Sequence, residues 1–556
     1  MSKAPIHSPP CSSSSTSSSK LWFSPETGVY ISKHAPRTLP QDPFQDLVTF
    51  LFSKPHKGEK ALIDALSGHC ISYSDLRPMV EALASGLHHS GISKGQLVLL
   101  LLPNSIFFPI ILLGILSLGA IVTTMNPLSS PQEIQKQTAG ERLTLVFSTP
   151  EKVGIFDSIC GAAPVIPVPE DLSYDSLQFQ IFHMLMSCKE QIFIKPAIRQ
   201  SDAAAVLFTS GTSGSSKGAI LTHGNFISMM ELFVRFEASQ YEKESFEDVC
   251  LAAIPMFHVY GMSLFALGLL SLGSAVVVMR RFDVQEAVKA IDRYRVTHVH
   301  LVPPIMAALV RVKDATGCVL SSLKQVSCGA APLSQKLIED FLLRFQHVDL
   351  IQGYGLTESA AVGTRGFNTK NCKKYESAGL LAPNMEAKVI DHESGTSLPP
   401  GKAGELWLRG PAIMKGYLND EEASASIIDE NGWLKTGDIG YFDQDGYFFI
   451  LDRLKDVIKY KGFQVAPADL ESVLITHAEI IDAAVTSAMD VEAGEIPVAF
   501  VVRGHGSNIS SAEIIKFVAM KHVHDQKVED SSFLLAALSG KPLVNFSEGG
   551  SLVRKL

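Results

Sequence analysis

The sequence predicts an α/β protein with a large N-terminal α/β body of parallel sheets, a β-rich subdomain and a small mobile C-terminal α+β lobe. Short apolar runs alternate with longer helical patterns from about residue 62 to 380, which is typical of parallel sheets covered by helices on both faces. From about residue 386 the pattern changes to shorter strands separated by turn dipeptides. At 556 residues the chain is also too long for one compact core, so two or more domains are expected.

Five apolar runs mark expected strands of the body. They are VLLLL (98–102), AAVLF (204–208), VCLAAIP (249–255), THVHLVP (297–303) and VDLIQGYG (348–355). Because helical patterns separate the runs, neighbouring strands are expected to lie parallel in the sheet.

Two long apolar stretches, 97–124 and 262–279, are the candidates for membrane-spanning helices. The first is interrupted at Pro103, which indicates a buried strand followed by a buried helix with Asn104 or Ser105 as its N-cap. The second contains glycines and ends in a β-branched run, which indicates a helix followed by a strand. Neither provides the uninterrupted span of about 20 apolar residues that a membrane helix needs, so no transmembrane segment is predicted.

The C-terminal part of the chain contains shorter elements. Strands are expected at AKVID (387–391), GELWLRG (404–410) and YFDQDGYFFILDRL (441–454), the last folded around an Asp445–Gly446 turn. A strand near KGFQV (461–465), a helix near PADLESVLITH (467–477) and a strand near DAAVTSA (482–488) would build the lobe. The predicted division is a tail over 1–40, a body over 41–452 and a lobe over 453–556, with the connection near 452–455.

The predicted tail is serine-rich and has no acidic residue before Glu26. This composition favours disorder. A transit peptide is the alternative, but the first 25 residues contain no arginine and no amphipathic period.

The overall composition excludes several classes of protein. With 46% hydrophobic and 19% charged residues the chain is typical of a globular protein, and a net charge of −9 argues against a nucleic-acid partner. Eight cysteines occur without a C-x-x-C pair, which indicates separate thiols in a reducing compartment. A monomer is expected.

The glycine-rich stretch from Leu207 to Asn225, LFTSGTSGSSKGAILTHGN, allows three interpretations. It does not match a Walker phosphate loop, because two serines separate Gly214 from Lys217. Residues 214–218 do match the G-x-S-x-G pattern of a hydrolase, but that turn requires a strand directly before it and a helix directly after. A solvated linker is the second alternative. The third is a clasp whose N–H groups and hydroxyls bind phosphate oxygens while Lys217 supplies the counter-charge.

Several further motifs resolve these alternatives by resemblance. They occur in the order TSGTSGSSKG (209–218), IPMFHVYG (254–261), VSCGAAPLS (326–334), QGYGLTES (352–359), GELWLRGP (404–411), WLKTGDIGYFDQDGYFFILDRLKD (433–456) and IKYKGFQVAPADLE (458–471). The series resembles the adenylate-forming acyl-CoA synthetases over about residues 44–528. Within that family it is most similar to plant 4-coumarate–CoA ligase and its ligase-like relatives.

The resemblance implies a two-step reaction with ATP, Mg²⁺ and coenzyme A. A carboxylic acid attacks the α-phosphorus of ATP to give an acyl-adenylate and pyrophosphate, and the thiol of CoA then displaces AMP. Phosphoryl transfer needs mainly positioning and charge neutralisation. The implied substrate is 4-coumarate or a related hydroxycinnamate.

The family pattern also implies a role for individual residues. Glu358 would bind Mg²⁺, Asp438 would accept from both ribose hydroxyls, and Lys455 would be the hinge of a rotating lobe. The ATP- or AMP-binding residues would be Ser210, Gly211, Thr212, Ser213, Gly214, Lys217, Gly329, Ala330, Ala331, Gln352, Gly353, Tyr354, Gly355, Thr357, Asp438 and Arg453. The acyl substrate would contact His258, Tyr260, Gly329, Gly353, Ala361 and Val362. Catalytic roles are implied for Lys459, Gln464, Lys541 and His258, and contacts with CoA for Lys461 and Gly462. By contrast, Asp443 and Asp445 are interpreted as turn formers.

Three departures from the family pattern affect these expectations. Ser327 stands where 4-coumarate ligases tend to carry a lysine, and Ala360–Ala361–Val362 stands where Gly-Pro-Val is common, so a fatty or jasmonate-precursor acid is the alternative substrate. Near the end of the chain only Ser539–Gly540–Lys541 resembles the usual P-x-x-x-G-K segment. A divergent, spliced or frame-shifted tail, and with it a catalytically impaired pseudoenzyme, is the alternative there. The final Arg-Lys-Leu leaves peroxisome and cytoplasm both open.

Overall fold

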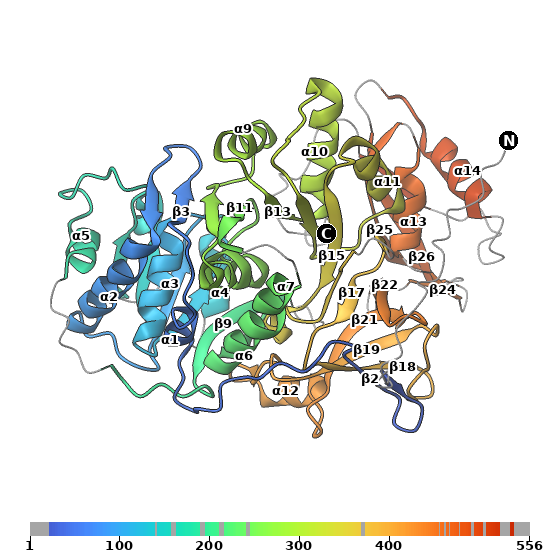
Figure 1. The fold of residues 1–556 in the computed structure, drawn as a ribbon. Helices are drawn as coiled ribbons and strands as arrows, with labels where there is room; N and C mark the ends of the chain where they lie inside the picture. The colour runs from blue at the N-terminus through green and yellow to red at the C-terminus, as the bar shows by residue number, and fades with distance from the viewer. Residues whose placement is uncertain are drawn as a thin grey trace.

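The computed structural model describes residues 22–538 with internal gaps. Outside the description lie residues 1–21, 139–141, 157–162, 189–194, 211–215, 241–244, 369–372, 455, 457, 461–462, 466, 478, 491–493, 504–506, 523–533 and 539–556. The described residues form three sheets and the helices around them (Figure 1).

The first sheet combines a parallel half with an antiparallel half. Its strands, in spatial order, are β1 (Phe23–Ser24), β2 (Val29–Ile31), β18 (Glu386–Ile390), β19 (Gly404–Arg409), β21 (Leu434–Phe442), β22 (Tyr447–Arg453), β17 (Gly379–Leu381), β16 (Thr364–Arg365), β15 (Asp349–Tyr354), β14 (Gln325–Cys328), β13 (His298–Leu301), β11 (Val249–Ala252), β12 (Ala275–Val278), β3 (Lys60–Asp64) and β4 (Cys70–Ser72). Strand β15 pairs parallel with β14 and antiparallel with β16. It is therefore the strand at which the α/β part of the sheet meets the β-rich part.

The second sheet contains the strands on both sides of the glycine-rich stretch. In spatial order they are β20 (Gly416–Tyr417), β10 (Ser216–Thr222), β9 (Ala203–Ser210), β6 (Ile121–Thr124), β5 (Leu97–Leu101), β7 (Leu143–Ser148) and β8 (Val165–Pro167). Strands β9, β6, β5, β7 and β8 are parallel, whereas β10 and β20 are antiparallel.

The third sheet belongs to the C-terminal part of the chain. Its strands are β24 (Phe463–Val465), β23 (Ile458–Tyr460), β26 (Gly494–Arg503) and β25 (Ile480–Asp490), with β27 (Leu534–Leu538) pairing parallel to β26. Buried apolar residues between 458 and 518 form a cluster of their own beneath it. This part of the chain therefore has its own small core.

Helices pack against these sheets. The α-helices are α1 (Leu47–Leu51), α2 (Tyr73–His89), α3 (Phe107–Ser117), α4 (Pro131–Thr138), α5 (Gln180–Met186), α6 (His223–Met229), α7 (Phe236–Ala238), α8 (Val259–Gly261), α9 (Val284–Tyr294), α10 (Pro303–Thr316), α11 (Gln335–Arg344), α12 (Glu421–Ile427), α13 (Pro467–Ile475) and α14 (Ser511–His522). Two π-helical segments are η2 (Met230–Arg235) and η4 (Met262–Gly268). The 3₁₀ turns are η1 (Pro150–Ile155), η3 (Ser245–Glu247), η5 (Leu270–Leu272) and η6 (Thr357–Ser359).

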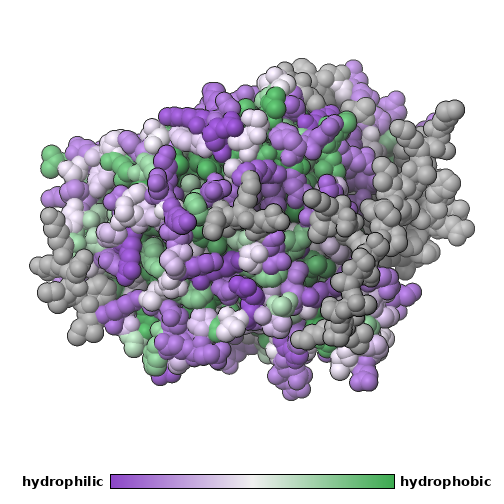
Figure 2. Space-filling view, in the orientation of Figure 1, coloured by the Kyte–Doolittle hydropathy of each residue, from purple (hydrophilic) through white to green (hydrophobic). Residues whose placement is uncertain are grey.

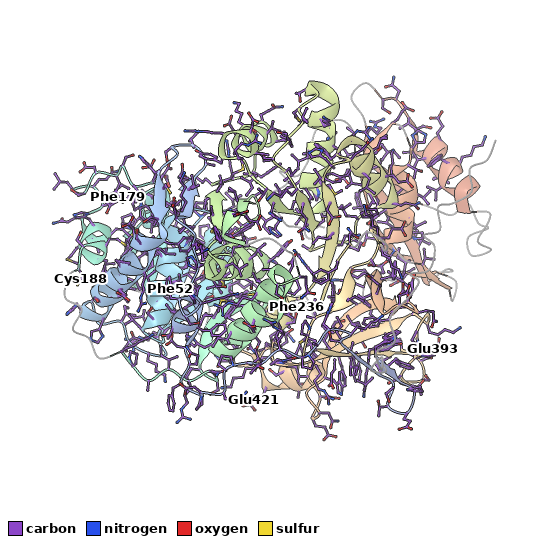
Figure 3. All side chains as sticks on the ribbon, viewed as in Figure 1. Phe52, Phe179, Cys188, Phe236, Glu393 and Glu421 are labelled. Carbon is purple, nitrogen blue, oxygen red and sulfur yellow. The ribbon has the colours of Figure 1, made fainter. Side chains whose placement is uncertain are left out.

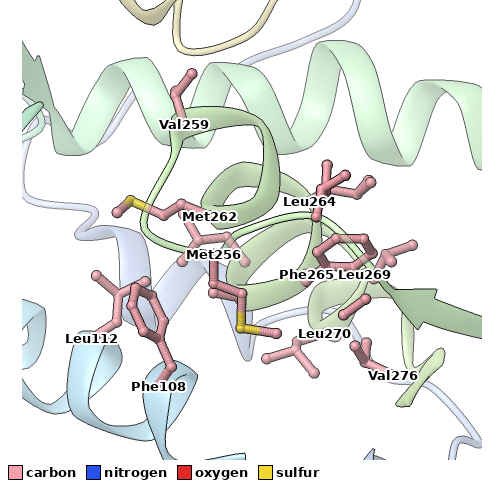
Figure 4. Packing of buried hydrophobic residues seen from close by; sticks show 14 of the residues in the cluster. Phe108, Leu112, Met256, Val259, Met262, Leu264, Phe265, Leu269, Leu270 and Val276 are labelled. Carbon is pink, nitrogen blue, oxygen red and sulfur yellow. The ribbon is translucent and has the colours of Figure 1, made fainter. Parts of the chain in front are cut away.

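Helix α3 lies in the core beside the second sheet. All of its residues are buried, and it packs on β6 and on η4. Figure 4 shows Phe108 and Leu112 of this helix beside Met256 and Met262. The strand and helix predicted for the apolar stretch 97–124 are confirmed as β5 and α3, and a further strand, β6, ends the stretch.

Asn104 and Ser105 are the two residues predicted as the N-cap of α3, and Asn104 does not take this role. Its side chain instead donates to the carbonyl of Ile254 at 3.0 Å and accepts from the N–H of Met256 at 2.7 Å. The hydroxyl oxygen of Ser105 does accept a hydrogen bond from the N–H of Phe108 at 3.1 Å. Asn104 therefore links the β5–α3 loop to the segment that leads to His258.

The prediction of a disordered tail over residues 1–40 needs correction for its described part. Strands β1 and β2 form there, and β2 pairs with β18. Tyr30 is fully buried, its ring stacks on Phe442 with centroids 4.6 Å apart, and its hydroxyl donates to the carbonyl of Leu398. The aromatic residues that follow the serine-rich run bury enough apolar surface to order this segment.

Within the described ranges, no helix combines the length and the apolar character needed to cross a membrane. Figure 2 shows mostly hydrophilic side chains on the face seen there, with hydrophobic ones in scattered patches.

His223, the first residue of α6, is fully buried. Its Nδ1 accepts the N–H of Leu47 at 3.2 Å, which requires the neutral ring. Burial lowers its pKa to about 4, although Asp46 and Asp202 oppose the shift. Since an unfolded histidine has a pKa of about 6.5, the unfolded state binds more protons between these two values. Stability from this group is therefore complete above pH 6.5 and is lost as the pH falls toward 4.

Acidification is thus expected to destabilise the wild type by up to about 3 kcal/mol through His223. The His223→Gln variant keeps an acceptor for Leu47 but cannot titrate. Between pH 7.5 and pH 5, the urea midpoint of unfolding should fall more for the wild type than for this variant. An equal fall in both proteins would contradict the assignment.

Candidate active site

The site is built around β15, at the junction of the two halves of the first sheet. Gln352 on this strand donates from Nε2 to the carbonyl of Tyr375 at 2.7 Å and accepts from the N–H of Leu333 at 3.3 Å. The first bond joins β15 to the segment between β16 and β17, and the second joins it to the loop after β14. Within that loop Ala330 and Ala331 are exposed.

The glycine-rich stretch connects two antiparallel strands. Ser210 pairs with Ser216 and Thr209 pairs with Lys217, and the intervening residues lie outside the described ones. Of the predicted clasp, this gap contains Gly211, Thr212, Ser213 and Gly214. Strand β10 follows the gap, and a helix begins only at His223. The hydrolase interpretation therefore fails, because its serine needs a helix directly after the turn.

Lys217 is held beside β20. Its Nζ lies 3.8 Å from Oδ2 of Asp420 and 5.4 Å from the ring centroid of Tyr417, and its side chain is only 18% exposed. Tyr417 pairs with Ala219 across the strands. The ammonium group is therefore shielded from solvent and positioned next to the end of the glycine-rich stretch.

Glu358, on η6, is fixed by a hydrogen bond from the second sheet. The hydroxyl of Tyr417 donates to Oε1 of Glu358 at 2.9 Å, and the carbonyl of Glu358 accepts from the N–H of Met414 at 2.8 Å. Burial and the neighbouring carboxylate raise the pKa of Tyr417 above its ordinary value, so the phenol keeps its proton. Lys217 and Glu358 are thus brought together around one tyrosine.

The described residues contain no cluster of three or more histidine, cysteine or acidic ligands. An ion held at Glu358 would take phosphate oxygens and water as its other ligands. Mg²⁺ commonly takes this arrangement, because it binds through one or two carboxylates plus substrate phosphates. The donor set fits the predicted ion.

Asp438 lies on β21 and is only 4% exposed. Its Oδ2 accepts from the hydroxyl of Tyr354 at 2.7 Å, and its Oδ1 lies 3.0 Å from Nε of Arg453, its cross-strand partner on β22. Burial raises the pKa of Asp438 above its ordinary value, while Arg453 and Tyr354 oppose the shift. The arrangement places a buried carboxylate at the end of β15.

The turn after β15 has an unusual backbone. Ala360 and Ala361 have φ values of 50° and 67°, and Ala330 in the neighbouring loop has 69°. Non-glycine residues seldom adopt this left-handed region, which costs about 1–2 kcal/mol per residue. A methyl group added at Gly355 would lie 2.3 Å from the carbonyl oxygen of Ala361, so glycine is required there.

The predicted acyl-binding residues include an aromatic ring against one glycine, which in turn adjoins a second. A methyl group at Gly329 would lie 3.3 Å from Cε1 of Tyr260 and 3.4 Å from the carbonyl oxygen of Gly353. Of the other residues predicted to contact the acyl substrate, Val362 is fully buried and His258 is exposed. Tyr260, Gly329 and Gly353 therefore form one wall, which we call the acyl wall.

The predicted residues of the lobe are only partly described. Lys459 on β23 pairs with Gln464 on β24, but their side chains are outside the description. The same holds for the whole of Lys455, Lys461, Gly462 and Lys541. The two aspartates interpreted as turn formers do shape the β21–β22 turn, since Oδ1 of Asp443 accepts from the N–H groups of Asp445 and Tyr447.

Sequence reasoning missed three residues beside the site. Tyr417 fixes Glu358, and Arg365 and Glu237 form a buried ion pair behind the acyl wall. A signal for Arg365 exists in the sequence, because a lone cation follows the small and apolar run Ala-Ala-Val-Gly-Thr. No pattern in the sequence joined it to Glu237, which lies 128 positions away.

Comparison with family models identifies this arrangement. Residues 52–418 match the model described as AMP-binding enzyme, and residues 469–534 match the AMP-binding enzyme C-terminal domain. The chain belongs to the AMP-binding enzyme family. This AMP-binding enzyme is an AMP-forming acid–CoA ligase that depends on ATP, and the resemblance to 4-coumarate–CoA ligase-like proteins is confirmed.

Two relatives and one solved structure illustrate the similarity. The AMP-binding enzyme is 52% identical to 4-coumarate–CoA ligase-like 6 of Arabidopsis thaliana, over 95% of this chain and 94% of the relative. It is 40% identical to peroxisomal OPC-8:0-CoA ligase 1 of the same plant, over 93% and 94%. The ATP-bound MatB structure from Rhodopseudomonas palustris has the same fold, with a TM-score of 0.78 at 24% identity over 88% of this chain and 94% of that one.

Proposed function

We propose that this ligase activates 4-coumarate or a related hydroxycinnamate through an acyl-adenylate. The observation that carries the proposal is the acyl wall, in which the Tyr260 ring lies against Gly329 and Gly329 adjoins the backbone of Gly353. A planar aromatic acid can stack on such a ring, and the two glycines place no side chain beside it. The name of the 52% identical relative, 4-coumarate–CoA ligase-like 6, supports the same substrate class.

The ATP side of the reaction is proposed to use the residues around β15. Lys217, together with the clasp residues Ser210 to Gly214, would neutralise the phosphates, and Asp438 would accept from the ribose hydroxyls beside Arg453. The carboxylate of the acid would then attack the α-phosphorus with loss of pyrophosphate. The shielded position of Lys217 and the fixed orientation of Asp438 support these roles, because both groups are pre-positioned.

When bound, Mg²⁺ would neutralise phosphate charge, and Glu358 is the residue proposed to hold it. Tyr417 would keep the Glu358 carboxylate in place through its hydrogen bond to Oε1. Thr357, which precedes it on η6, is proposed to contact the α-phosphate through its hydroxyl.

The thioester step is proposed to involve the lobe. Lys455 would be the hinge, Lys459 and Gln464 would act in the half-reactions, and Lys461 and Gly462 would contact CoA. Lys541 is the candidate for the adenylation lysine. The division at residue 452, the monomeric state and the compartment, peroxisome or cytoplasm, are proposed from the sequence.

A fatty or jasmonate-precursor acid is the second candidate substrate. It is favoured by Ser327 and Ala361, which depart from the 4-coumarate ligase pattern at the acyl side. The 40% identical relative named peroxisomal OPC-8:0-CoA ligase 1 also supports it.

Pyrophosphate release tests these alternatives directly. Release should depend on acid, ATP and Mg²⁺ together, and acyl-CoA should form only when CoA is added. A panel with 4-coumarate, caffeate, cinnamate, octanoate and a keto-substituted fatty acid ranks the substrates by kcat/KM. A pseudoenzyme would release no pyrophosphate with any acid, and preference for the fatty acids would select the second candidate.

A further inference from the structure

Arg365 is a buried cation directly behind the acyl wall. It is 4% exposed and is the cross-strand partner of Gly353. A methyl group added at Gly353 would lie 3.5 Å from both Cδ and Nη1 of Arg365. The guanidinium therefore lies across the glycine that the bound acid is proposed to contact.

Three side chains fix this guanidinium. Its Nη2 lies 2.8 Å from Oε1 of Glu237, its Nη1 donates to Oγ of Ser327 at 2.8 Å, and its Cζ lies 5.3 Å from the ring centroid of Phe233. The side chain of Glu237 is only 14% exposed. A buried ion pair gains little stability over apolar residues of the same volume, because both charges lose their hydration. The pair therefore calls for another explanation.

Tyr260 adds a second polar group to the same wall. Its hydroxyl is buried beside the hydroxyl of Ser327 and makes no hydrogen bond of good geometry with the residues that the structure describes. Burial raises its pKa to about 12, with Arg365 opposing the shift, so the phenol is neutral near pH 7. A buried hydroxyl without a partner costs about 1–3 kcal/mol. A polar group of a bound acid would remove that cost.

The space beyond Arg365 is small. A cavity of about 10 Å³ lies there, lined by Arg365, His34, Phe233, Phe236 and Phe367 among others; Phe236 lies on α7 (Figure 3). This volume is about that needed for one water molecule. A cavity of this size has no room for an extension of a bound acid on that side of Arg365.

We propose that Arg365 is a specificity-determining residue that selects acids whose far end carries a hydrogen-bonding group, such as a phenolic hydroxyl or a ketone. Glu237 is a positioning residue that acts through Arg365. An acid ending in plain phenyl or alkyl would leave the Tyr260 hydroxyl unpaired and would cover the guanidinium with apolar surface. Sites built to bind a substrate hydroxyl reject analogues without it by large factors for this reason. The inference deepens the proposed function and rests on its assignment of the acyl wall.

The test compares 4-coumarate with cinnamate, which differ only in the phenolic hydroxyl, and a keto fatty acid with the alkyl acid of equal length. For the wild type, kcat/KM of pyrophosphate release should favour each polar-ended acid by about 10²-fold or more. The variant Arg365→Met/Glu237→Leu removes both charges and keeps the volume. It should lower each ratio at least about tenfold while leaving the KM for ATP unchanged.

A second buried pair provides the matched control. Arg235 is 5% exposed, lies 3.6 Å from Oε2 of Glu231, and directs its Nη2 to the carbonyl of Phe50. The variant Arg235→Met/Glu231→Leu should keep the wild-type ratios. If the kcat/KM ratios fall equally in both double variants, the cause is a general loosening of the packing, and the proposal is overturned.

The outcomes separate this inference from the proposed function. If the wild type releases pyrophosphate with none of the acids, both are overturned. If it activates cinnamate and the alkyl acid as efficiently as their polar-ended partners, only the inference falls. Unchanged ratios in a folded Arg365→Met/Glu237→Leu variant would also overturn it.

Discussion

Replacement of Glu358 by alanine is expected to slow acid-dependent pyrophosphate release by about 10²–10³-fold, a loss comparable to that of one transition-state-stabilising donor in other enzymes. The carboxylate is held by Tyr417 at 2.9 Å and is the single acidic side chain that we assign to the metal. The variant should also form acyl-CoA more slowly, because both half-reactions use nucleotide phosphate charge. Quenched-flow assays of pyrophosphate and of thioester measure the two steps separately.

Two comparisons make the Glu358 result specific. Tyr417→Phe keeps the carboxylate and loses only its hydrogen bond, so its rate should fall by no more than about tenfold, as expected for one hydrogen bond of about 1 kcal/mol. Added Mg²⁺ should partly restore this variant and should not restore Glu358→Ala. A Glu358→Ala enzyme with the wild-type rate would remove Glu358 from the proposed mechanism.

Replacement of Asp438 by asparagine is expected to weaken ATP binding by about 10²-fold or more. A hydrogen bond to a charged acceptor contributes about 1.5–3 kcal/mol, and two ribose hydroxyls would lose such an acceptor. The change keeps the size of the side chain, although Arg453 loses its ionic partner. Calorimetric titration with a non-hydrolysable ATP analogue measures the effect without catalysis.

Asp443 is the matched control for Asp438, because it lies in the same β21–β22 hairpin. Its carboxylate holds the turn and contacts Lys374. Asp443→Asn should lower the thermal stability and leave the affinity for the ATP analogue unchanged. If the two variants lose affinity equally, the effect of Asp438 comes from distortion of the hairpin and not from contact with the nucleotide.

Much of the fold was predictable because its signals are local. The run VLLLL (98–102) identified β5, and the Asp445–Gly446 turn identified the β21–β22 hairpin, since burial pattern and turn chemistry lie within a few residues. The N-terminal strands were not predicted. A serine-rich composition was extended to residue 40, and only the tertiary contact of Tyr30 with Phe442 shows why that segment is ordered.

The site divides in the same way. Glu358 and Asp438 could be proposed because each lies within a contiguous motif. The residues that hold these carboxylates in place are harder to predict. Tyr417, for example, lies 59 positions from Glu358, and the sequence around Tyr417 does not indicate a hydrogen bond to a carboxylate. The same reason explains the missed pair of Glu237 and Arg365, whose meeting depends on how η2, α7 and β16 pack.

The β1–β2 hairpin has a practical consequence for protein engineering. It covers the outer edge of β18 and the face of Phe442, so deletion of residues 1–40 would leave an unprotected strand edge of the kind that promotes aggregation. Affinity tags and fluorescent fusions are therefore better joined upstream of Trp22, and shortened versions of the chain should begin no later than that residue.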